Sequence, residues 1–462
     1  MQDLKHLSQK KSASLFKSFG PGSRNKRRKT SADPVRHKLL LPTGKRLLRL
    51  KLALLFIAII LVVTPLSVLA LRQSKPSGLH ESTLFSILAK VFPSTTKTAK
   101  PTIKTSHFEI ASDLLATAET NGSSVTAETP DGMQYTYTIL GDMQNRVYEF
   151  MAKKQVPYGV FVAIEPSSGR ILGMTSYSSV DPLWVKRSAY ELYPMASLFK
   201  IITASAALES NKITPESVIE FRGNSYSENP RYWDISPHGR NNSMNVSYAM
   251  GKSINPLYGR VASAIAGKPS IMESISRFGF NQELLPGTPV KQSRAGEPAS
   301  THELMLMGAG LDHDVEISPL HAAVIMSAIA NSGKMMAPGL TSGIFDAQGA
   351  EKEKFTPHEL RRLVSQETAA SLTRMLSSTV LTGTSRKAFH DRRGRPLLNI
   401  PVAAKTGSID GLTPKGHYSW FAAFAPIQNP RIAMVALVIN SDKWKIKASQ
   451  VGVEALEEFF KE

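Results

Sequence analysis

Strand-like hydrophobic runs stand near both ends of the sequence that follows residue 134. Residues 135–140 are rich in aromatic and β-branched side chains, which favour strands. Residues 159–165 and 170–177 are two further runs of this kind, and the turn residues at 166–169 between them predict a hairpin. Strand signals return near the C-terminus at residues 402–406, 418–425 and 431–440.

In most of the sequence between these strands, hydrophobic residues recur at the spacing of an α-helix. Residues 142–154 place Met143, Val147 and Met151 on one face, with Asp142 as a candidate N-cap. Further helices are predicted over residues 201–208, 256–266, 319–331 and 449–460. Strands at both ends around a helical middle predict an α+β domain, with one antiparallel sheet built from both ends of the domain and a helical subdomain inserted.

The longest uncharged run lies before this domain, at residues 52–71. Its twenty residues, LALLFIAIILVVTPLSVLAL, carry no charge, and at about 1.5 Å per residue they match the roughly 30 Å hydrocarbon core of a bilayer. A cleaved signal peptide would have a shorter apolar region of about 7 to 15 residues near the start of the chain. The pattern therefore predicts one transmembrane helix.

Positive charge is concentrated before this predicted helix. The chain carries a net charge of +19, and residues 1–51 account for +13 of it, with 15 Lys and Arg against Asp3 and Asp33. The positive-inside rule places this basic tail in the cytoplasm and the residues after 72 outside it. Attraction to anionic lipid and control of topology explain the tail more simply than nucleic-acid binding, for which no motif accompanies the charge.

The segment between the predicted membrane helix and the domain has a different composition. Residues 79–92 have helical spacing of Leu, Val and Phe, which predicts a short amphipathic helix. Residues 93–130 are rich in Ser, Thr, Pro, Lys and Glu and are typical of a linker. The predicted organisation is a cytoplasmic tail (1–51), a transmembrane helix (52–71), a juxtamembrane segment and linker (72–134), and a compact domain (135–462).

Three short strings in the compact domain carry candidate chemistry. They are SxxK at Ser197 to Lys200, SxN at Ser253 to Asn255, and KTGS at Lys405 to Ser408. A serine is a poor nucleophile at its free pKa, and a lysine one helical turn away can activate it if the pKa of that lysine is lowered. A hydroxyl can pass protons, and an amide can both donate and accept hydrogen bonds. Together the strings predict a serine acyl-transfer site without histidine.

The third string supplies groups that suit a carboxylate. Lys405 brings positive charge, the hydroxyls of Thr406 and Ser408 can donate hydrogen bonds, and Gly407 lets another backbone approach closely. Taken singly, each string also has an ordinary structural explanation: a capping serine, turn chemistry or a plain strand end. Their joint occurrence in this order favours a site.

Copies of the first two strings test how specific they are. SxxK recurs at Ser8, Ser14, Ser23 and Ser94, SxN recurs at Ser227 and Ser243, and only KTG is unique. The predicted topology puts the first three SxxK copies on the opposite side of the membrane from KTG. The other copies lie in the expected linker or in a stretch rich in Asn, Pro and Gly. Context therefore selects the copies at 197 and 253.

The strings and their surroundings resemble those of penicillin-binding proteins, which belong to the serine acyltransferase superfamily that includes the serine β-lactamases. YPMASLFKIITASAALE resembles the family's nucleophile helix, and NVSYAMGKSINPLYGRVA resembles its second motif. VAAKTGSID, followed by HYSWFAAFAP and PRIAMVALVIN, resembles its closing strands. The resemblance covers roughly residue 135 to the C-terminus and implies the β-lactamase/transpeptidase-like fold.

The resemblance also implies catalytic roles in D,D-transpeptidation. Ser197 would attack the penultimate D-Ala carbonyl of a peptidoglycan stem peptide and form an acyl-enzyme. Lys200 would accept the serine proton, with its pKa lowered by burial and by Lys405. Ser253 would relay a proton to the leaving amine.

Substrate binding and partners follow from the same resemblance. Asn255 would hold the peptide, and Lys405, Thr406 and Ser408 would bind its terminal carboxylate, with Gly407 between them. The implied partners are stem peptides, β-lactam antibiotics, the cytoplasmic membrane and glycan-polymerising enzymes, and no cofactor or metal ion is expected. The chain has no cysteine, which excludes disulfides and cysteine-ligated metals.

Three alternative functions stay open. The same residues serve a D,D-carboxypeptidase when water replaces the acceptor amine. A β-lactamase or penicillin sensor of this fold is a second alternative, although no ExxLN string occurs between Ser253 and Lys405 to supply a deacylating base. The third alternative is a catalytically silent membrane-anchored scaffold.

The predicted spacing between membrane helix and compact domain bears on the domain organisation. About 65 residues lie between them, which are too few for the glycosyltransferase domain or the pedestal domain of larger family members.

Overall fold

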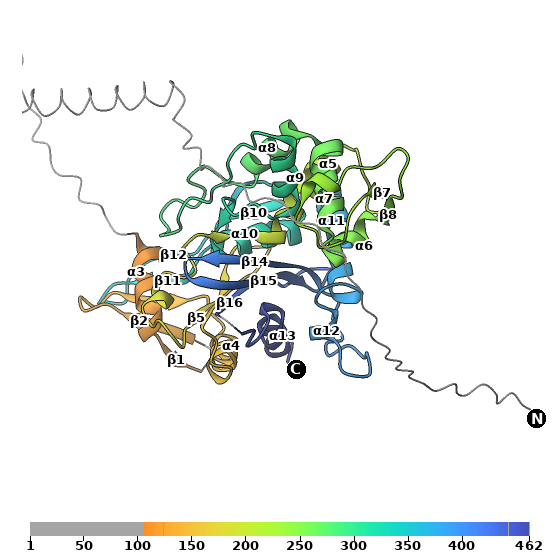
Figure 1. Cartoon of the computed structure of the whole chain (residues 1–462). Helices are drawn as coiled ribbons and strands as arrows, with labels where there is room; N and C mark the ends of the chain where they lie inside the picture. The colour runs from red at the N-terminus through yellow and green to blue at the C-terminus, as the bar shows by residue number, and fades with distance from the viewer. Residues whose placement is uncertain (1–105, 123, 442, 462) are drawn as a thin grey trace, which may run out of the picture. The chain divides into compact units, whose positions relative to one another are not determined.

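The computed structural model describes residues 106–461 apart from 123 and 442, and its central element is a five-stranded antiparallel sheet (Figure 1). The strands follow in the order β14 (Ala403–Leu412), β15 (Lys415–Ala425), β16 (Ile432–Asn440), β4 (Tyr158–Ile164) and β5 (Ile171–Tyr177). The predicted hairpin pairs through β4 with the last strand of the chain. The α+β prediction, with a sheet built from both ends of the domain, is confirmed.

The sheet is buried on both faces, which explains the near-continuous hydrophobic runs of its central strands. In β4, Val160 and Val162 belong to one hydrophobic core, whereas Phe161 and Ala163 belong to a second core. Successive side chains point to opposite faces of a strand, so the sheet separates the two cores.

Helices cover both faces of the sheet. Helices α4 (Gly141–Lys153) and α13 (Ala448–Phe459) pack against each other and against strands β5, β15 and β16. Helix α10 (Pro319–Ala330) packs on β16, β4 and β15, and α11 (Gln366–Leu381) packs on β14. The inserted helical subdomain consists of α5 (Lys200–Glu209), α6 (Val246–Lys252), α7 (Asn255–Arg260), α8 (Lys268–Arg277) and α9 (Thr301–Ala309).

Short strand pairs connect these helices to the sheet region. The three pairs are β6 (Tyr193–Pro194) with β9 (Glu316–Ile317), β7 (Val218–Phe221) with β8 (Asn242–Asn245), and β10 (Lys334–Met336) with β13 (Glu359–Arg362). A short helix, α12 (Arg386–Phe389), follows α11. The pair β6 and β9 matters most for the site, because β6 leads directly into the segment that contains Ser197.

A second five-stranded sheet lies beside the first and includes residues that the sequence pattern assigned to a linker. Its order is β1 (Glu119–Asn121), β2 (Ser124–Glu128), β3 (Gln134–Tyr137), β11 (Thr341–Phe345) and β12 (Glu351–Lys354). Helix α3 (His107–Leu114) precedes it. The structure differs from the expected linker here because β2 forms a hairpin with β3, and β3 in turn pairs with the distant strand β11. The polar composition of β2 does not indicate this pairing.

Two local predictions differ from the structure, and several others lie outside the described residues. Asp142 is not the cap of α4, because the N-cap residue is Leu140 and no side chain caps that helix. The helix predicted over 256–266 changes to a π-helical turn at residues 261–266. No described helix is long and apolar enough to cross a bilayer. The predicted tail, transmembrane helix and amphipathic helix lie outside the described residues.

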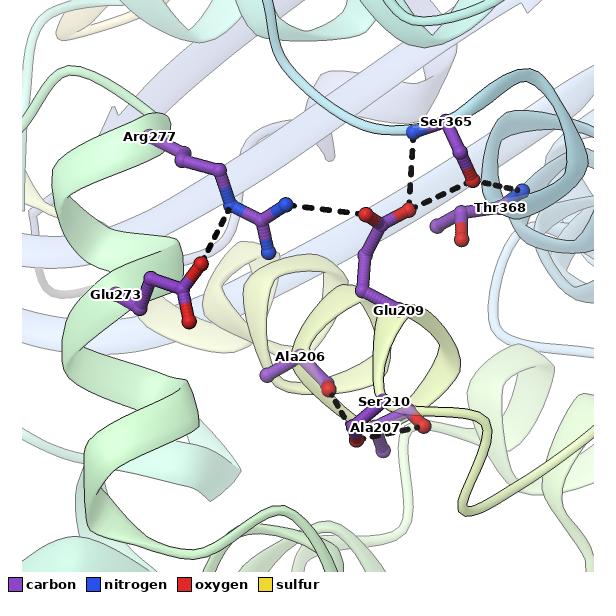
Figure 2. A network of polar contacts seen from close by, with 8 residues as sticks. All are labelled: Ala206, Ala207, Glu209, Ser210, Glu273, Arg277, Ser365 and Thr368. Atoms are coloured by element: carbon purple, nitrogen blue, oxygen red, sulfur yellow. Dashed lines mark hydrogen bonds and ion pairs between the residues drawn. The ribbon is translucent and has the colours of Figure 1, made fainter.

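A polar network fixes the far end of helix α5 (Figure 2). The carboxylate of Glu209, the last residue of α5, forms an ion pair with Arg277 of α8 at 3.0 Å. It also accepts hydrogen bonds from the backbone N–H and the hydroxyl of Ser365 at 2.9 and 2.8 Å. Ser365 is itself the N-cap of α11. The helix that carries Lys200 is therefore tied to two neighbouring helices.

Candidate active site

Ser197 lies in a tight turn between β6 and α5. Residues Ala196–Phe199 form a 3₁₀ turn, and the N-cap of α5 is Phe199, so Ser197 does not cap the helix. The preceding residue, Ala196, has φ of 54°, a left-handed conformation that is uncommon for a residue with a side chain. Such strain persists only where the surrounding structure holds it, and it often occurs at functional sites.

Close packing holds this strained turn in place. A Cβ atom on Gly310 would lie 2.2 Å from the Ala196 carbonyl oxygen, and Gly310 has φ of 68°. A Cβ atom on Gly407 would lie 3.1 Å from Cβ of Ala196. The indole N–H of Trp420 donates to the carbonyl of Pro194 at 2.9 Å. The glycine of KTGS therefore allows strand β14 to pack against the turn that carries Ser197.

Lys200 is fully buried and its Nζ atom touches three oxygen atoms. The distances are 2.7 Å to Ser197 Oγ, 2.9 Å to Asn255 Oδ1 and 2.5 Å to the Ala309 carbonyl. Burial, helped by the nearby charge of Lys405, lowers the pKa of Lys200 well below its usual value. In the neutral amine, two N–H groups can donate hydrogen bonds to Asn255 Oδ1 and to the Ala309 carbonyl, because these two oxygens can only accept hydrogen bonds. The lone pair then faces the hydroxyl of Ser197.

Ser253 and Asn255 occupy a bend between two helices. Ser253 is the C-cap of α6 with φ of 59°, and Asn255 begins α7, followed by a proline that suits the first turn of a helix. The Asn255 Nδ2 group donates to the Ser227 carbonyl at 3.3 Å. Because this bond uses the donor end of the amide, the acceptor end is directed at Lys200.

Lys405 extends the arrangement from strand β14. Its Nζ atom donates to Ser253 Oγ at 2.9 Å and to the Thr406 carbonyl at 2.7 Å. The side chain is fully buried, and burial lowers the pKa of Lys405 to about 7. Near neutral pH this amine therefore lies close to its midpoint, which suits a group that exchanges protons with a neighbouring hydroxyl.

The other KTGS hydroxyls lie toward solvent. Thr406 is half-buried and Ser408 is exposed, and both are on β14, an edge strand of the sheet. The hydroxyl of Thr406 lies 2.5 Å from that of Thr384. An edge strand with exposed hydroxyls beside a buried lysine leaves room for an extended ligand.

The structure thus brings the predicted residues into two neighbouring hydrogen-bonded groups. Lys200 bonds Ser197 and Asn255 in one group, and Lys405 bonds Ser253 in the other. The charge of Lys405 contributes to the lowered pKa of Lys200, and Thr406, Gly407 and Ser408 follow Lys405 along β14. The rejected SxxK copies lie outside the described residues. Ser227 lies near the site, but it contributes its backbone carbonyl to Asn255 and its hydroxyl to the indole N–H of Trp233.

Sequence reasoning missed four groups that support these residues. The Ala309 carbonyl, Gly310, Thr384 and Trp420 come from segments that no site string contains. The small-residue run at 308–310 was the only local signal, because glycines there permit a close backbone approach. Within the described residues, no group of three His, Asp or Glu side chains could hold a metal ion.

Comparison with known families decides the affiliation of the chain. Residues 159–459 match the family described as the penicillin binding protein transpeptidase domain. The chain belongs to this family. The predicted resemblance to penicillin-binding proteins is confirmed, and the match contains all eight of the predicted site residues.

Two curated relatives and one solved structure illustrate the likeness. The peptidoglycan D,D-transpeptidase PbpA of Mycobacterium tuberculosis (strain CDC 1551 / Oshkosh) is 29% identical over 318 residues, which cover 61% of this chain and 62% of the relative. Stage V sporulation protein D of Bacillus subtilis (strain 168) is 28% identical over 343 residues, which cover 67% of this chain and 50% of the relative. The chain thus spans one half to about three-fifths of these relatives.

Among solved structures, a ceftriaxone acyl-enzyme complex of penicillin-binding protein A from M. tuberculosis matches with a TM-score of 0.60 at 24% identity. The match covers 70% of this chain and 79% of that one. The penicillin-binding protein transpeptidase fold is therefore shared.

Proposed function

We propose that the protein is a serine D,D-transpeptidase that crosslinks peptidoglycan stem peptides ending in D-Ala-D-Ala through an acyl-enzyme on Ser197. The observation that carries the proposal is the 2.7 Å contact between Ser197 Oγ and the buried amine of Lys200, whose pKa is lowered. Relatives named as peptidoglycan D,D-transpeptidases support the same reaction.

Acylation begins with transfer of the Ser197 hydroxyl proton to the neutral Lys200 amine. The serine oxygen then bonds to the penultimate D-Ala carbonyl carbon. Backbone N–H groups of Ser197 and Ser408 stabilise the resulting oxyanion. When the tetrahedral intermediate collapses, its C–N bond breaks and the nitrogen of the terminal D-Ala takes the proton that Lys200 accepted, relayed through Ser253, so that the Lys200 amine is neutral again. The leaving group departs as D-Ala.

Lys405 has two roles in this scheme. In its protonated form it attracts the terminal carboxylate of the stem peptide, to which Thr406 and Ser408 donate hydroxyl hydrogen bonds. Its 2.9 Å contact with Ser253 Oγ also couples that hydroxyl to a proton source. Asn255 holds the donor peptide while its Oδ1 atom orients the Lys200 amine.

The second half-reaction transfers the acyl group to an amine of another stem peptide. The amine loses a proton to the site base, its nitrogen bonds to the acyl carbon, and the ester bond to Ser197 breaks with return of a proton to the serine oxygen. In the described part of the chain, no carboxylate bonds to Ser197, Lys200, Ser253 or Lys405. This arrangement favours transfer to an amine over the fast hydrolysis that a β-lactamase needs.

We further propose the topology that the sequence pattern predicts. The basic tail is cytoplasmic, residues 52–71 span the cytoplasmic membrane, and the domain that holds Ser197 is extracytoplasmic, where peptidoglycan is assembled. Glycan-polymerising enzymes are the proposed protein partners, because crosslinking requires glycan strands.

Fluorescent penicillin tests the acyl-enzyme. The wild-type protein should become covalently labelled, and Ser197→Ala should show no label because the acylated oxygen is absent. Ser205→Ala is the matched control, since Ser205 lies on the same helix and bonds only the Ile201 carbonyl. Absence of label on the wild type supports the scaffold alternative, and label on Ser197→Ala contradicts the site assignment.

Product analysis separates the remaining alternatives. A synthetic pentapeptide donor ending in D-Ala-D-Ala is supplied with and without an acceptor amine such as D-alanine amide, and products are identified by mass spectrometry. A transpeptidase forms the acceptor adduct as its main product. A carboxypeptidase releases D-Ala and forms the hydrolysed tetrapeptide at the same rate in both cases, and rapid loss of the penicillin label indicates a β-lactamase.

A further inference from the structure

A cavity lies at the edge of the central sheet opposite to the edge near Ser197. Its volume is about 930 Å³, and its walls come from α3 and the residues 115–118 after it, from β1 and β2, from α4 and β5, and from the segment 182–190. Strand β5 is at the opposite end of the sheet order from β14, so four strand spacings, about 19 Å, separate the two edges. The cavity therefore belongs to a different site, and its argument is independent of the proposed function.

One wall of this cavity is an edge strand that is only partly covered. The first half of β5 is occupied: the Leu172 carbonyl accepts from the Leu140 N–H at 2.8 Å, and the Met174 N–H donates to Gln144 Oε1 at 3.0 Å. The outward groups of an edge strand recur at every second residue. The next outward groups are the carbonyl of Met174 and the N–H and carbonyl of Ser176.

No residue in the described range bonds these outward groups of Met174 and Ser176. Both residues line the cavity, with Thr175, Tyr177 and Ser178 between and after them. A row of unpaired backbone groups on an edge strand is a template for another strand. The second half of β5 therefore offers backbone hydrogen bonds to an extended peptide.

The side chains around the cavity select for a polar, acidic peptide. Lys186 and Arg187 supply two positive charges against the single negative charge of Asp113, a net +1 among the lining residues. Lys186 is exposed, and Arg187 retains 46% of its side-chain exposure although it lies 3.5 Å from Glu109. Charge complementarity thus favours carboxylates in the bound segment.

Tyrosines provide the remaining contact surface. Tyr148 and Tyr177 form an edge-to-face pair with ring centroids 5.7 Å apart, and Tyr148 is 46% exposed. Tyr190, on the other side of the cavity, is buried and its hydroxyl lies 2.5 Å from that of Ser112. Rigid aromatic rings beside open backbone groups suit alternate side chains of an added strand.

We propose that this cavity binds an extended acidic segment of a partner polypeptide, which adds as a further strand to the outer edge of β5 at Met174 and Ser176. Backbone bonds supply the affinity, and Lys186 and Arg187 supply the preference for acidic side chains. An ordinary L-peptide fits this pairing better than a stem peptide, because alternating D-residues disrupt a regular ladder.

Two labelled peptides test the proposal on the purified full chain by fluorescence anisotropy. The acidic probe is acetyl-Glu-Val-Thr-Val-Glu-Thr-amide, and the control carries Lys in place of both Glu residues. We expect saturable binding of the acidic probe that is at least tenfold tighter than that of the basic control, and that weakens as salt is raised. Equal binding of both peptides, or no saturable binding of the acidic probe up to 1 mM, overturns the proposal.

Two substitutions of one residue separate backbone pairing from side-chain contact. Ser176→Pro removes the outward N–H at an edge position that tolerates proline, and we expect at least a tenfold loss of affinity. Ser176→Ala keeps this N–H and loses only the 2.6 Å contact with Ser188, so its affinity should stay within twofold of wild type. Cooperative thermal unfolding verifies that each variant is folded.

A charge reversal keeps the test decisive if the proline variant does not fold. Lys186→Glu should reduce the preference for the acidic probe at least tenfold, because the net charge of the lining changes from +1 to −1. An unchanged affinity for the acidic probe in both Ser176→Pro and Lys186→Glu overturns the proposal.

Discussion

The two edges of the central sheet use the same architecture in different ways. At the β14 edge, functional groups are side chains, and the two amines among them are completely buried. At the β5 edge, the available groups are the backbone of Met174 and Ser176 and the exposed cation of Lys186. Burial changes the pKa of a lysine. An exposed lysine, in contrast, can attract an oppositely charged ligand at little desolvation cost.

The comparison teaches where rigidity is needed. A buried amine such as Lys200 must keep all of its partners, because an unpaired buried polar group is costly. The turn around Ser197 is accordingly fixed by Gly310 and by Trp420. The open half of β5 has no comparable requirement, since water can serve its backbone groups until a ligand replaces it.

The largest expected effect that tests this contrast is the loss of acylation in Lys200→Arg. Arginine stays protonated at all accessible pH values, so it places a fixed positive charge where the mechanism requires a neutral amine, and it cannot accept the Ser197 proton. The rate of penicillin acylation should fall by about 10²- to 10⁴-fold, measured by stopped-flow or quenched labelling. Lys212→Arg, just beyond helix α5 and bonded to the Ala266 carbonyl, should label at the wild-type rate. Wild-type labelling by Lys200→Arg would exclude Lys200 as the base.

The second effect concerns stability, and it is specific to Lys405 at the β14 edge of the sheet. The pKa of Lys405 is about 7 in the folded protein and 10.5 is its ordinary value. Between these values the unfolded chain binds more protons, so stability rises with pH. Relative to Lys405→Met, the wild type should gain about 3 to 4 kcal/mol of unfolding free energy between pH 7 and pH 10, since one pKa unit corresponds to about 1.4 kcal/mol.

Denaturant unfolding of both proteins at the two pH values measures this gain. Lys186→Met, at the exposed edge, should change the unfolding free energy by less than about 0.5 kcal/mol at either pH. A difference between wild type and Lys405→Met that does not depend on pH would contradict a depressed pKa for Lys405.

The smallest expected effect compares two glycines. Gly310→Ala places a Cβ atom 2.2 Å from a backbone oxygen beside Ser197, and it should cost about 3 kcal/mol and slow acylation. Gly122, in the turn between β1 and β2, also has a positive φ, but no heavy atom lies within 4 Å of its added Cβ. Gly122→Ala should therefore cost only about 1 kcal/mol. Equal shifts in Tm for the two variants would show that packing against Ala196 is not what requires Gly310.

The sequence alone predicted the elements whose pattern is local. The strands at 159–165 and 431–440 are hydrophobic along their whole length because both faces of the sheet are covered, and the helix at 319–331 is apolar because it packs on that sheet. A prediction failed where strand pairing overrides composition. Residues Ser124–Glu128 have the composition of a linker, but they form a strand because they pair with β3, which is itself held by the distant strand β11.

For the candidate site, the sequence by itself determined which residue types carry the chemistry, since SxxK, SxN and KTGS each contain their functional groups within four residues. Only the tertiary structure decided their protonation and orientation. The depressed pKa of Lys200 comes from complete burial and from Lys405, which is 205 residues away in the chain. Long-range contacts such as those of the Ala309 carbonyl with Lys200, and of Gly310 with Ala196, leave no periodic signal in a sequence, because they depend on how distant segments pack.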